Sequence, residues 1–169
     1  RHNFIVEGKN ILIIGSGGAD RGIAIFLSQH KVNSIDIVAR NMGKGKKLVD
    51  ELSKYTNSFY LQLKEIENID ILKYDLIIQS TPIGMKNIEG ELVFPYERLR
   101  EKQVIADIVY NPLNTNFLSR ASSRVKEYIS GLEMLVYQGY HSFKIWTGLE
   151  ENTDVMLKIG GDFLEVKNE

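Results

Sequence analysis

The sequence predicts an α/β fold, in which helices flank a doubly wound parallel sheet of about six strands. Two observations predict it: short aliphatic runs alternate with segments of helical spacing, and a glycine cluster follows the first run. Parallel neighbours need a crossover connection, usually a helix, so this alternation is typical of parallel sheets. Residues 10–14 form the first run and indicate a strand buried on both faces.

The other elements follow with the same alternation, and helices end the chain. In the first helix, Ile23, Phe26 and Leu27 fall on one apolar stripe. Residues 64–74 give no clear pattern, and Gly160 and Gly161 weaken the last helix. We expect further strands at residues 34–39, 58–63, 75–79, 103–108 and 125–129, and helices at residues 19–30, 43–54, 115–124, 133–146 and 152–166.

The composition excludes several classes of protein. Of 169 residues, 43% are hydrophobic, and 21 basic against 22 acidic side chains give a net charge of −1. This balance leaves no electrostatic footprint for nucleic acid, and no apolar run approaches the roughly 20 residues of a membrane span. The lack of cysteine and the three scattered histidines argue against a metal site. The chain starts at Arg1 without a signal-peptide pattern, so we expect a cytoplasmic, processed or truncated chain whose residues 1–169 form one domain.

The glycine cluster joins the first strand to the first helix. It comprises Gly15, Ser16, Gly17, Gly18 and Ala19. Gly15 suits a tight turn, Gly17 lets the backbone approach a pyrophosphate, and the helix N-terminus offers free N–H groups to that anion. Asp20 occupies the sixth place, where the strict G-x-G-x-x-G pattern has glycine. The context predicts a Rossmann-like dinucleotide site, and the alternative is a glycine turn without a ligand.

The end of the second strand indicates which dinucleotide binds. Asp36 has about the spacing of the acid that binds the ribose of NAD, but it lies toward the wrong end of its strand. The strand ends at Arg40, which can pair a 2′-phosphate through two hydrogen bonds. Lys44, Lys46 and Lys47 follow, either as further phosphate ligands or as a solvated basic helix face.

Three further segments come at strand ends, where ligands bind in parallel sheets. They are residues 80–85, 107–112 and 131–138. Each has a structural alternative: Thr81 can belong to a turn, Tyr110 can be a half-buried ring, and Gln138 can cap a helix or face water.

Taken in order, these segments resemble the C-terminal NADP-binding domain of shikimate dehydrogenases over residues 10–156. The family's G-A-G-G-A loop is similar to residues 15–19, its N-R-T clamp to residues 39–41, and its N-A-T-x-x-G-M stretch to residues 79–85. Its D-x-x-Y-x-P-x-x-T and G-x-x-M-L-x-x-Q segments are fully present at residues 107–115 and 131–138.

The resemblance implies a role for each site residue, with NADP as the cofactor. Residues 15–19 would hold the pyrophosphate. Three residues would surround the 2′-phosphate, namely Arg40, Asn41 and Lys44; three would line the nicotinamide, namely Thr81, Ile108 and Gly131; and two would reach the substrate, namely Tyr110 and Gln138. The chain departs from the family at Ala39, Asn41 and Gln79, which replace Asn, Thr and Asn.

The resemblance also implies that catalysis needs a second domain. Family members reduce 3-dehydroshikimate to shikimate with a Lys and an Asp from an N-terminal substrate domain, in N-V-T-x-P and N-T-D patterns. Neither pattern precedes residue 10, and Asn152-Thr153-Asp154 is expected only to cap the last helix. We therefore expect no catalytic residue and no metal ligand in this chain, and inactivity without the missing domain. The alternatives are a non-enzymatic nucleotide-sensing module or a related reductase acting on quinate.

The predicted helix at residues 133–146 carries apolar side chains on more than one face, among them Met134, Tyr140 and Trp146. In an isolated domain, part of this surface would face water, and large apolar patches usually find a partner. We expect self-association of the isolated chain as a homodimer. The alternative is that the last helix covers the patch and leaves a monomer.

Overall fold

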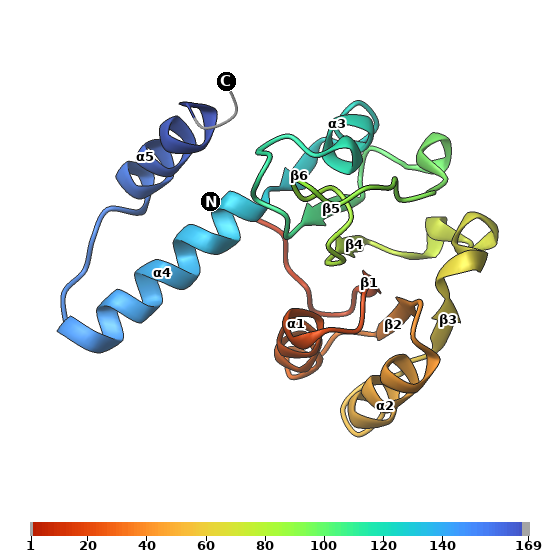
Figure 1. Cartoon of the computed structure of the whole chain (residues 1–169). Helices are drawn as coiled ribbons and strands as arrows, with labels where there is room; N and C mark the ends of the chain where they lie inside the picture. Colours follow the sequence, from red (N-terminus) through yellow and green to blue (C-terminus); the bar gives the residue numbers. More distant parts are fainter. Residues whose placement is uncertain (1, 167–169) are drawn as a thin grey trace.

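The structure, a computed structural model, describes residues 2–166 and confirms the predicted fold class. Six strands form one sheet in the order β3-β2-β1-β4-β5-β6, and every neighbouring pair is parallel (Figure 1). The strands are β1 (Asn10–Ile14), β2 (Ser34–Ala39), β3 (Tyr60–Gln62), β4 (Leu76–Gln79), β5 (Val104–Asp107) and β6 (Glu127–Ile129). The strand order reverses direction between β1 and β4, so the carboxyl ends of these strands frame the place where such sheets bind ligands.

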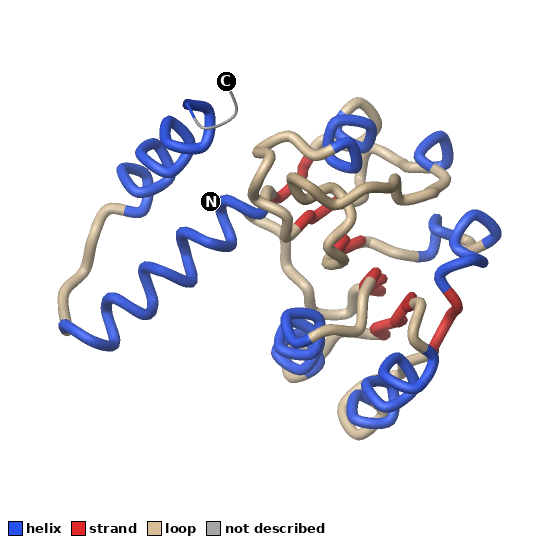
Figure 2. Tube along the Cα trace, in the orientation of Figure 1, coloured by secondary structure: helices blue, strands red, loops and turns tan. Residues whose placement is uncertain are grey.

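Five α-helices and three short 3₁₀ helices connect and flank the strands (Figure 2). Residues 64–74, which show no clear sequence pattern, contribute most of the first two 3₁₀ helices. The α-helices are α1 (Gly18–Ser28), α2 (Met42–Leu52), α3 (Asn116–Ser122), α4 (Gly131–Thr147) and α5 (Thr153–Val166), and the 3₁₀ helices are η1 (Leu63–Asn68), η2 (Ile71–Lys73) and η3 (Tyr96–Arg98).

The central strand is buried on both faces, as its sequence predicts. Ile11 and Ile13 pack toward the layer of α1 and α2, whereas Leu12 and Ile14 pack toward the layer of η1, η2 and α3. All four side chains are 0% exposed. Because successive side chains of a strand point to opposite faces, one aliphatic run supplies two cores, at about 1.5–3 kcal/mol for each buried side chain.

The helical pair α4–α5 extends away from the sheet (Figure 1). The two helices pack together through a small cluster built from Leu132, Val136, Leu157 and Leu164. Their outer surface stays apolar: Ile145 and Trp146 are each 81% exposed. The last helix thus folds back on α4, as the monomer alternative expects, but leaves a large apolar surface facing water.

Two smaller features complete the fold. Phe26, on the apolar stripe of α1, is 61% exposed and is not part of the core. It borders an apolar groove of about 450 Å³ between α1, the strands β4 to β6 and the first turn of α4. Within residues 2–166, no helix is long and apolar enough to cross a membrane.

Candidate functional site

The glycine-rich loop leaves β1 and starts α1 in a conformation that only glycine tolerates at its first position. Gly15 has a φ of +145° and its N–H donates to the carbonyl of Val38 at 2.8 Å. A Cβ atom at Gly15 would lie 2.2 Å from the carboxylate Oδ1 of Asp20. Gly17 then serves as the N-cap of α1, and residues 17–19 are exposed. The first amides of α1 are therefore open to an anion from solvent.

Asp20 fills the inner side of this loop with a carboxyl group. The side chain is 2% exposed, and its Oδ2 accepts a hydrogen bond from the Gly17 amide at 2.5 Å. Its Oδ1 is buried and has no hydrogen-bond partner among the described residues. Burial raises the pKa of Asp20 to about 6, against the opposing effect of the hydrogen bonds from the amides of Gly17 and Asp20 itself. The sequence marks Asp20 only as a departure from the glycine pattern, although its contact is local: Asp20 is the third residue of α1, and its carboxylate accepts from the N-cap amide as in a capping box.

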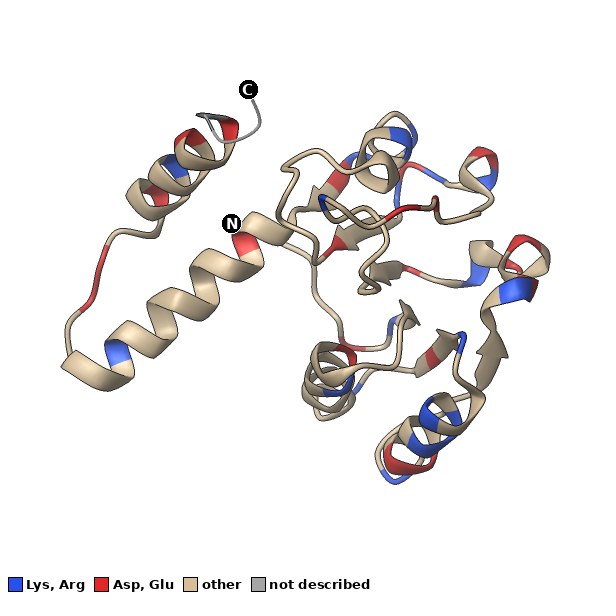
Figure 3. Cartoon of the chain, in the orientation of Figure 1, with Lys and Arg blue, Asp and Glu red and all other residues tan. Residues whose placement is uncertain are grey.

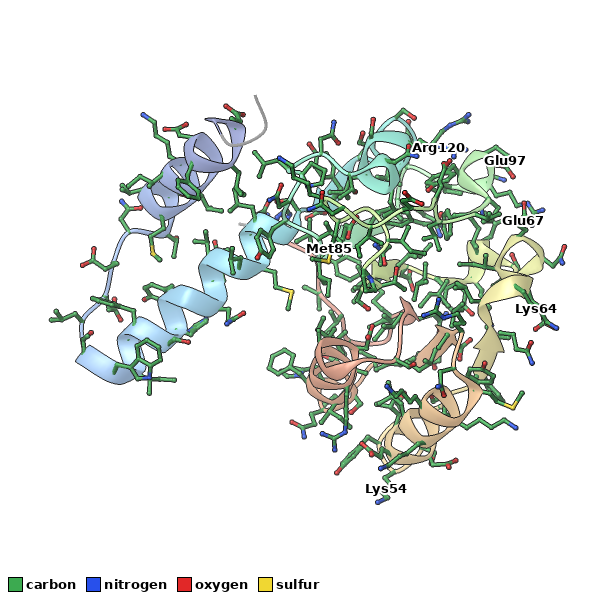
Figure 4. All side chains as sticks on the ribbon, viewed as in Figure 1. Lys54, Lys64, Glu67, Met85, Glu97 and Arg120 are labelled. Carbon is green, nitrogen blue, oxygen red and sulfur yellow. The ribbon has the colours of Figure 1, made fainter. Side chains whose placement is uncertain are left out.

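Arg40 lies directly after β2, as predicted, and is exposed. It borders a cavity of about 420 Å³ whose other walls come from η1 and from residues 91–93. Lys64 and Glu67 project from η1 at this edge of the sheet (Figure 4). Sequence reasoning missed both residues because they lie in the segment without a periodic pattern.

Basic residues lie along α2, among them Lys44, Lys46 and Lys47 (Figure 3). Lys44 and Lys47 line a cavity of about 170 Å³ together with Ser16, Gly17 and Arg21. Lys46 is not among the lining residues, so the structure separates the three lysines that the sequence groups together. Neither Arg40 nor Lys44 forms an ion pair within residues 2–166. Both cations are therefore available to a phosphate.

Asn41 and Asp36 have structural roles. The Asn41 side chain caps α2 by accepting from the Lys44 amide at 2.9 Å, which orients the lysine-bearing turn. Asp36 is 2% exposed and accepts from the Tyr74 hydroxyl at 2.8 Å. Because its carboxylate is engaged inside the protein, Asp36 is not placed to bind the ribose of NAD.

The loops after β4 and β5 enclose a second cavity of about 420 Å³. Thr81, Ile108 and Tyr110 line it, as the resemblance implies, and Tyr110 is 40% exposed. The lining also includes Met85, the last residue of the expected segment 80–85, and Lys86, which sequence reasoning did not place at the site. The only sequence signal for Lys86 is that it directly follows that segment.

Buried polar groups hold these two loops in place. Gln79 is 0% exposed; its amide nitrogen donates to the Ile83 carbonyl at 2.9 Å and its oxygen accepts from the Thr81 amide at 2.5 Å. Asp107 accepts from the Thr115 hydroxyl at 2.6 Å and from the Val109 amide at 2.9 Å. Burial raises the pKa of Asp107, partly offset by those two hydrogen bonds. Gln79, which departs from the family's Asn, therefore shapes the loop that carries Thr81.

Gly131 and Gln138 are placed differently although they share one motif. A Cβ at Gly131 would lie 2.3 Å from the Val109 carbonyl and 2.5 Å from that of Ile108, so α4 starts in direct backbone contact with the loop after β5. Gln138, farther along α4, is exposed and does not line the cavity with Tyr110. The structure thus brings Thr81, Ile108, Tyr110 and Gly131 together, and Gln138 lies outside this group.

The N-T-D sequence at residues 152–154 has the expected capping role. The Asn152 side chain accepts from the amides of Asp154 at 2.9 Å and Val155 at 3.3 Å, at the start of α5. Such hydrogen bonds satisfy the free amides of a helix N-terminus.

Two family descriptions match the chain. Residues 2–117 match the family described as Shikimate / quinate 5-dehydrogenase, and residues 131–159 match the Shikimate 5'-dehydrogenase C-terminal domain. The shikimate dehydrogenase (NADP(+)) of Methanococcus maripaludis is 45% identical over 159 residues, which cover 91% of this chain and 55% of the relative. That of Methanocaldococcus jannaschii is 42% identical over 154 residues, 89% of this chain and 54% of the relative.

Solved structures agree with this match. A shikimate dehydrogenase crystallised in complex with NADP+ has a TM-score of 0.80 and 38% identity over 94% of this chain and 56% of that one. A ligand-free 5-ketofructose reductase of Gluconobacter has a TM-score of 0.88 and 26% identity over 95% of this chain and 58% of that one. The chain thus spans little more than half the length of the relatives it matches. With its fold, its loop geometry and these matches in agreement, the chain belongs to the shikimate/quinate 5-dehydrogenase family.

Proposed function

We propose that this chain is the NADP-binding domain of a shikimate dehydrogenase. The observation that carries the proposal is the cavity shared by the glycine-rich loop and Lys44, with Arg40 close by at the end of β2. It combines free helix amides with unpaired cations, which suits a ligand with both a diphosphate and a 2′-phosphate. The engaged carboxylate of Asp36 supports NADP over NAD.

The proposed path of the cofactor follows the carboxyl ends of the strands. The amides after Gly15 would hold the diphosphate, and Arg40 with Lys44 would hold the 2′-phosphate, on a turn that Asn41 caps. The cavity between Arg40 and η1 has room for the adenine. The nicotinamide would lie beside Thr81, Ile108 and Gly131, which form the loops around the second cavity.

NADPH supplies the hydride that reduces a ketone such as 3-dehydroshikimate. The residues of this chain bind the cofactor and orient its reactive ring, while Tyr110 faces the space where the substrate would sit. Hydride transfer to a ketone leaves a developing alkoxide, which needs a positioned proton donor. We propose that the Lys and Asp of the family's patterns belong to the part of the relatives' length that this chain does not match, so the chain alone is inactive.

A second candidate is a reductase of the same family that acts on another hydroxylated substrate, such as quinate. The similarity in fold to a protein named 5-ketofructose reductase, with a TM-score of 0.88, favours keeping this candidate. Most substrate contacts would lie outside this chain. Its residues therefore support the assignment of the cofactor more strongly than the assignment of a particular substrate.

The test of the proposal is cofactor selectivity. Isothermal titration of the purified chain should give tighter binding of NADPH than of NADH. Arg40→Ala should weaken NADPH binding by about 1.5–3 kcal/mol, or tenfold and more, because a charge-assisted contact is lost. Arg124→Ala removes an exposed arginine beyond α3 and serves as the control, with no change expected. Equal affinities for the two cofactors, or an unchanged NADPH affinity in Arg40→Ala, would contradict the assignment.

A further inference from the structure

Asp20 places a carboxyl group where the proposed cofactor needs an anion cradle. Its Oδ2 already takes the Gly17 amide, and its Oδ1 lies against Gly15, buried and without a partner. A buried carboxylate oxygen without a hydrogen bond is costly when it is charged, so this site favours the neutral acid.

The two protonation states of Asp20 act in opposite ways on a phosphate in the loop. An ionised carboxylate carries a negative charge at the base of the loop and therefore repels the charge of a diphosphate bound there. The neutral acid keeps the bond from Gly17 to one oxygen and gains an O–H donor on the other. Protonation therefore removes both the negative charge beside the diphosphate and the buried anionic oxygen that has no partner.

We propose that Asp20 controls the affinity of the glycine-rich loop for the cofactor, because its carboxyl group must carry a proton when the diphosphate occupies the loop. This inference rests on the proposed NADP-binding function and adds to it a residue that departs from the family's loop. The effect of Asp20 should apply to the diphosphate of any dinucleotide. It should not depend on the 2′-phosphate, which Arg40 is proposed to hold.

The surroundings of Asp20 make this proton equilibrium accessible near neutral pH. Charged side chains around the loop are Arg21, which pairs with Glu51 at 2.7 Å, and Lys44 and Lys47 on α2, with Arg40 at the end of β2. The neighbouring residues of β1 are uncharged, as are Ser80 and Thr81 after β4. Burial raises the pKa of Asp20 to about 6 despite the amide hydrogen bonds. If binding requires the protonated form of Asp20, the affinity for the cofactor falls by about tenfold for each pH unit above that pKa.

The experiment compares NADP affinity across pH in the wild-type chain and in Asp20→Asn. The Asn side chain keeps the acceptor for the Gly17 amide and cannot ionise. Near pH 8 we expect the variant to bind NADP at least tenfold more tightly than wild type, and the difference should shrink toward about pH 5.5. Asp162→Asn, an exposed change on α5, is the matched control and should follow wild type.

A second probe isolates the diphosphate. Adenosine 2′-phosphate carries the same 2′-phosphate as NADP, with the same protonation behaviour, but it has no diphosphate. Its affinity should therefore be equal in wild type and Asp20→Asn at every pH. If Asp20→Asn does not fold, as judged by circular dichroism, Asp20→Ser supplies a smaller neutral acceptor for the same comparison.

The outcomes separate the inference from the function on which it rests. Equal NADP affinities of wild type and variant across pH, or weaker binding by the variant throughout, would overturn the inference and leave Asp20 as a structural support of the loop. A difference of the same size with adenosine 2′-phosphate would also overturn it. Failure of both proteins to bind NADP at any pH would refute the proposed function itself.

Discussion

Replacing Gly131 with alanine should destabilise the protein, although alanine is the better helix former. The added Cβ would lie 2.3 Å from the Val109 carbonyl oxygen, 2.4 Å from its carbon and 2.5 Å from the Ile108 oxygen. These are rigid backbone atoms, so either α4 or the loop after β5 must shift by about 1 Å. Overpacking of this kind costs about 1–3 kcal/mol.

Gly139 provides a control in the same helix. A Cβ there would meet only the terminal methyl of Met156, at 4.0 Å, which is ordinary contact. Gly139→Ala should therefore stabilise the protein by about 0.5–1 kcal/mol, because alanine loses less backbone entropy on folding. The two substitutions are chemically identical, and the structure predicts opposite signs for them.

The assay is urea denaturation followed by circular dichroism, with thermal melting as a second measure. We expect Gly131→Ala to lower the free energy of unfolding by about 2 kcal/mol and the melting temperature by about 4–8 °C, at an unchanged denaturant slope. Equal stability of Gly131→Ala and wild type would show that α4 does not start in contact with the loop. If Gly139→Ala lowered the free energy of unfolding, the expected gain from the higher helix propensity of alanine would be contradicted.

Three further outcomes follow from the same structure. Gly17→Val should abolish NADPH binding without unfolding, because its side chain would occupy the place of the pyrophosphate; retained binding by a normally folded variant, measured calorimetrically, would make the loop only a turn. Light scattering across a concentration series should show self-association that weakens in Trp146→Ser, since Trp146 is 81% exposed; a monomer at all concentrations contradicts this. Shikimate oxidation by the isolated chain that is lost on Asp154→Ala would place catalysis in this chain. Burial alone would lower the pKa of His2, but hydrogen bonds to Glu133 and Glu127 outweigh it and raise the pKa; the stabilisation by His2 is thus fully present below its ordinary pKa of about 6.5 and is lost as pH rises through the raised value, so His2→Gln should reduce the free energy of unfolding near pH 5.5 and change it little near pH 8.5.

The sequence by itself determines the strand–helix order and the position of the glycine-rich loop. Alternation and aliphatic runs are local signals, and an aliphatic run indicates a strand buried on both faces even when its neighbours in the sheet are unknown. The bounds of Asn10–Ile14 and Ser34–Ala39 are therefore predicted to the residue. The edge strand β3 is shorter than its expected range, residues 58–63, and it ends at Gln62, which pairs with Ala39, the last residue of β2. Arg40 is predictable for the same reason, since a residue directly after a strand must lie at the sheet's carboxyl edge.

Only the tertiary structure decides which side chains meet across these elements. Gly131 touches the backbone after β5, and Lys64 lines the cavity beside Arg40 although its segment shows no periodic pattern. Gln138 shares a motif with Gly131 yet lies outside the cavity, because α4 leaves the sheet after its first turn. Contacts of this kind depend on how the elements pack in three dimensions, and a periodic pattern reports only on the face of a single element.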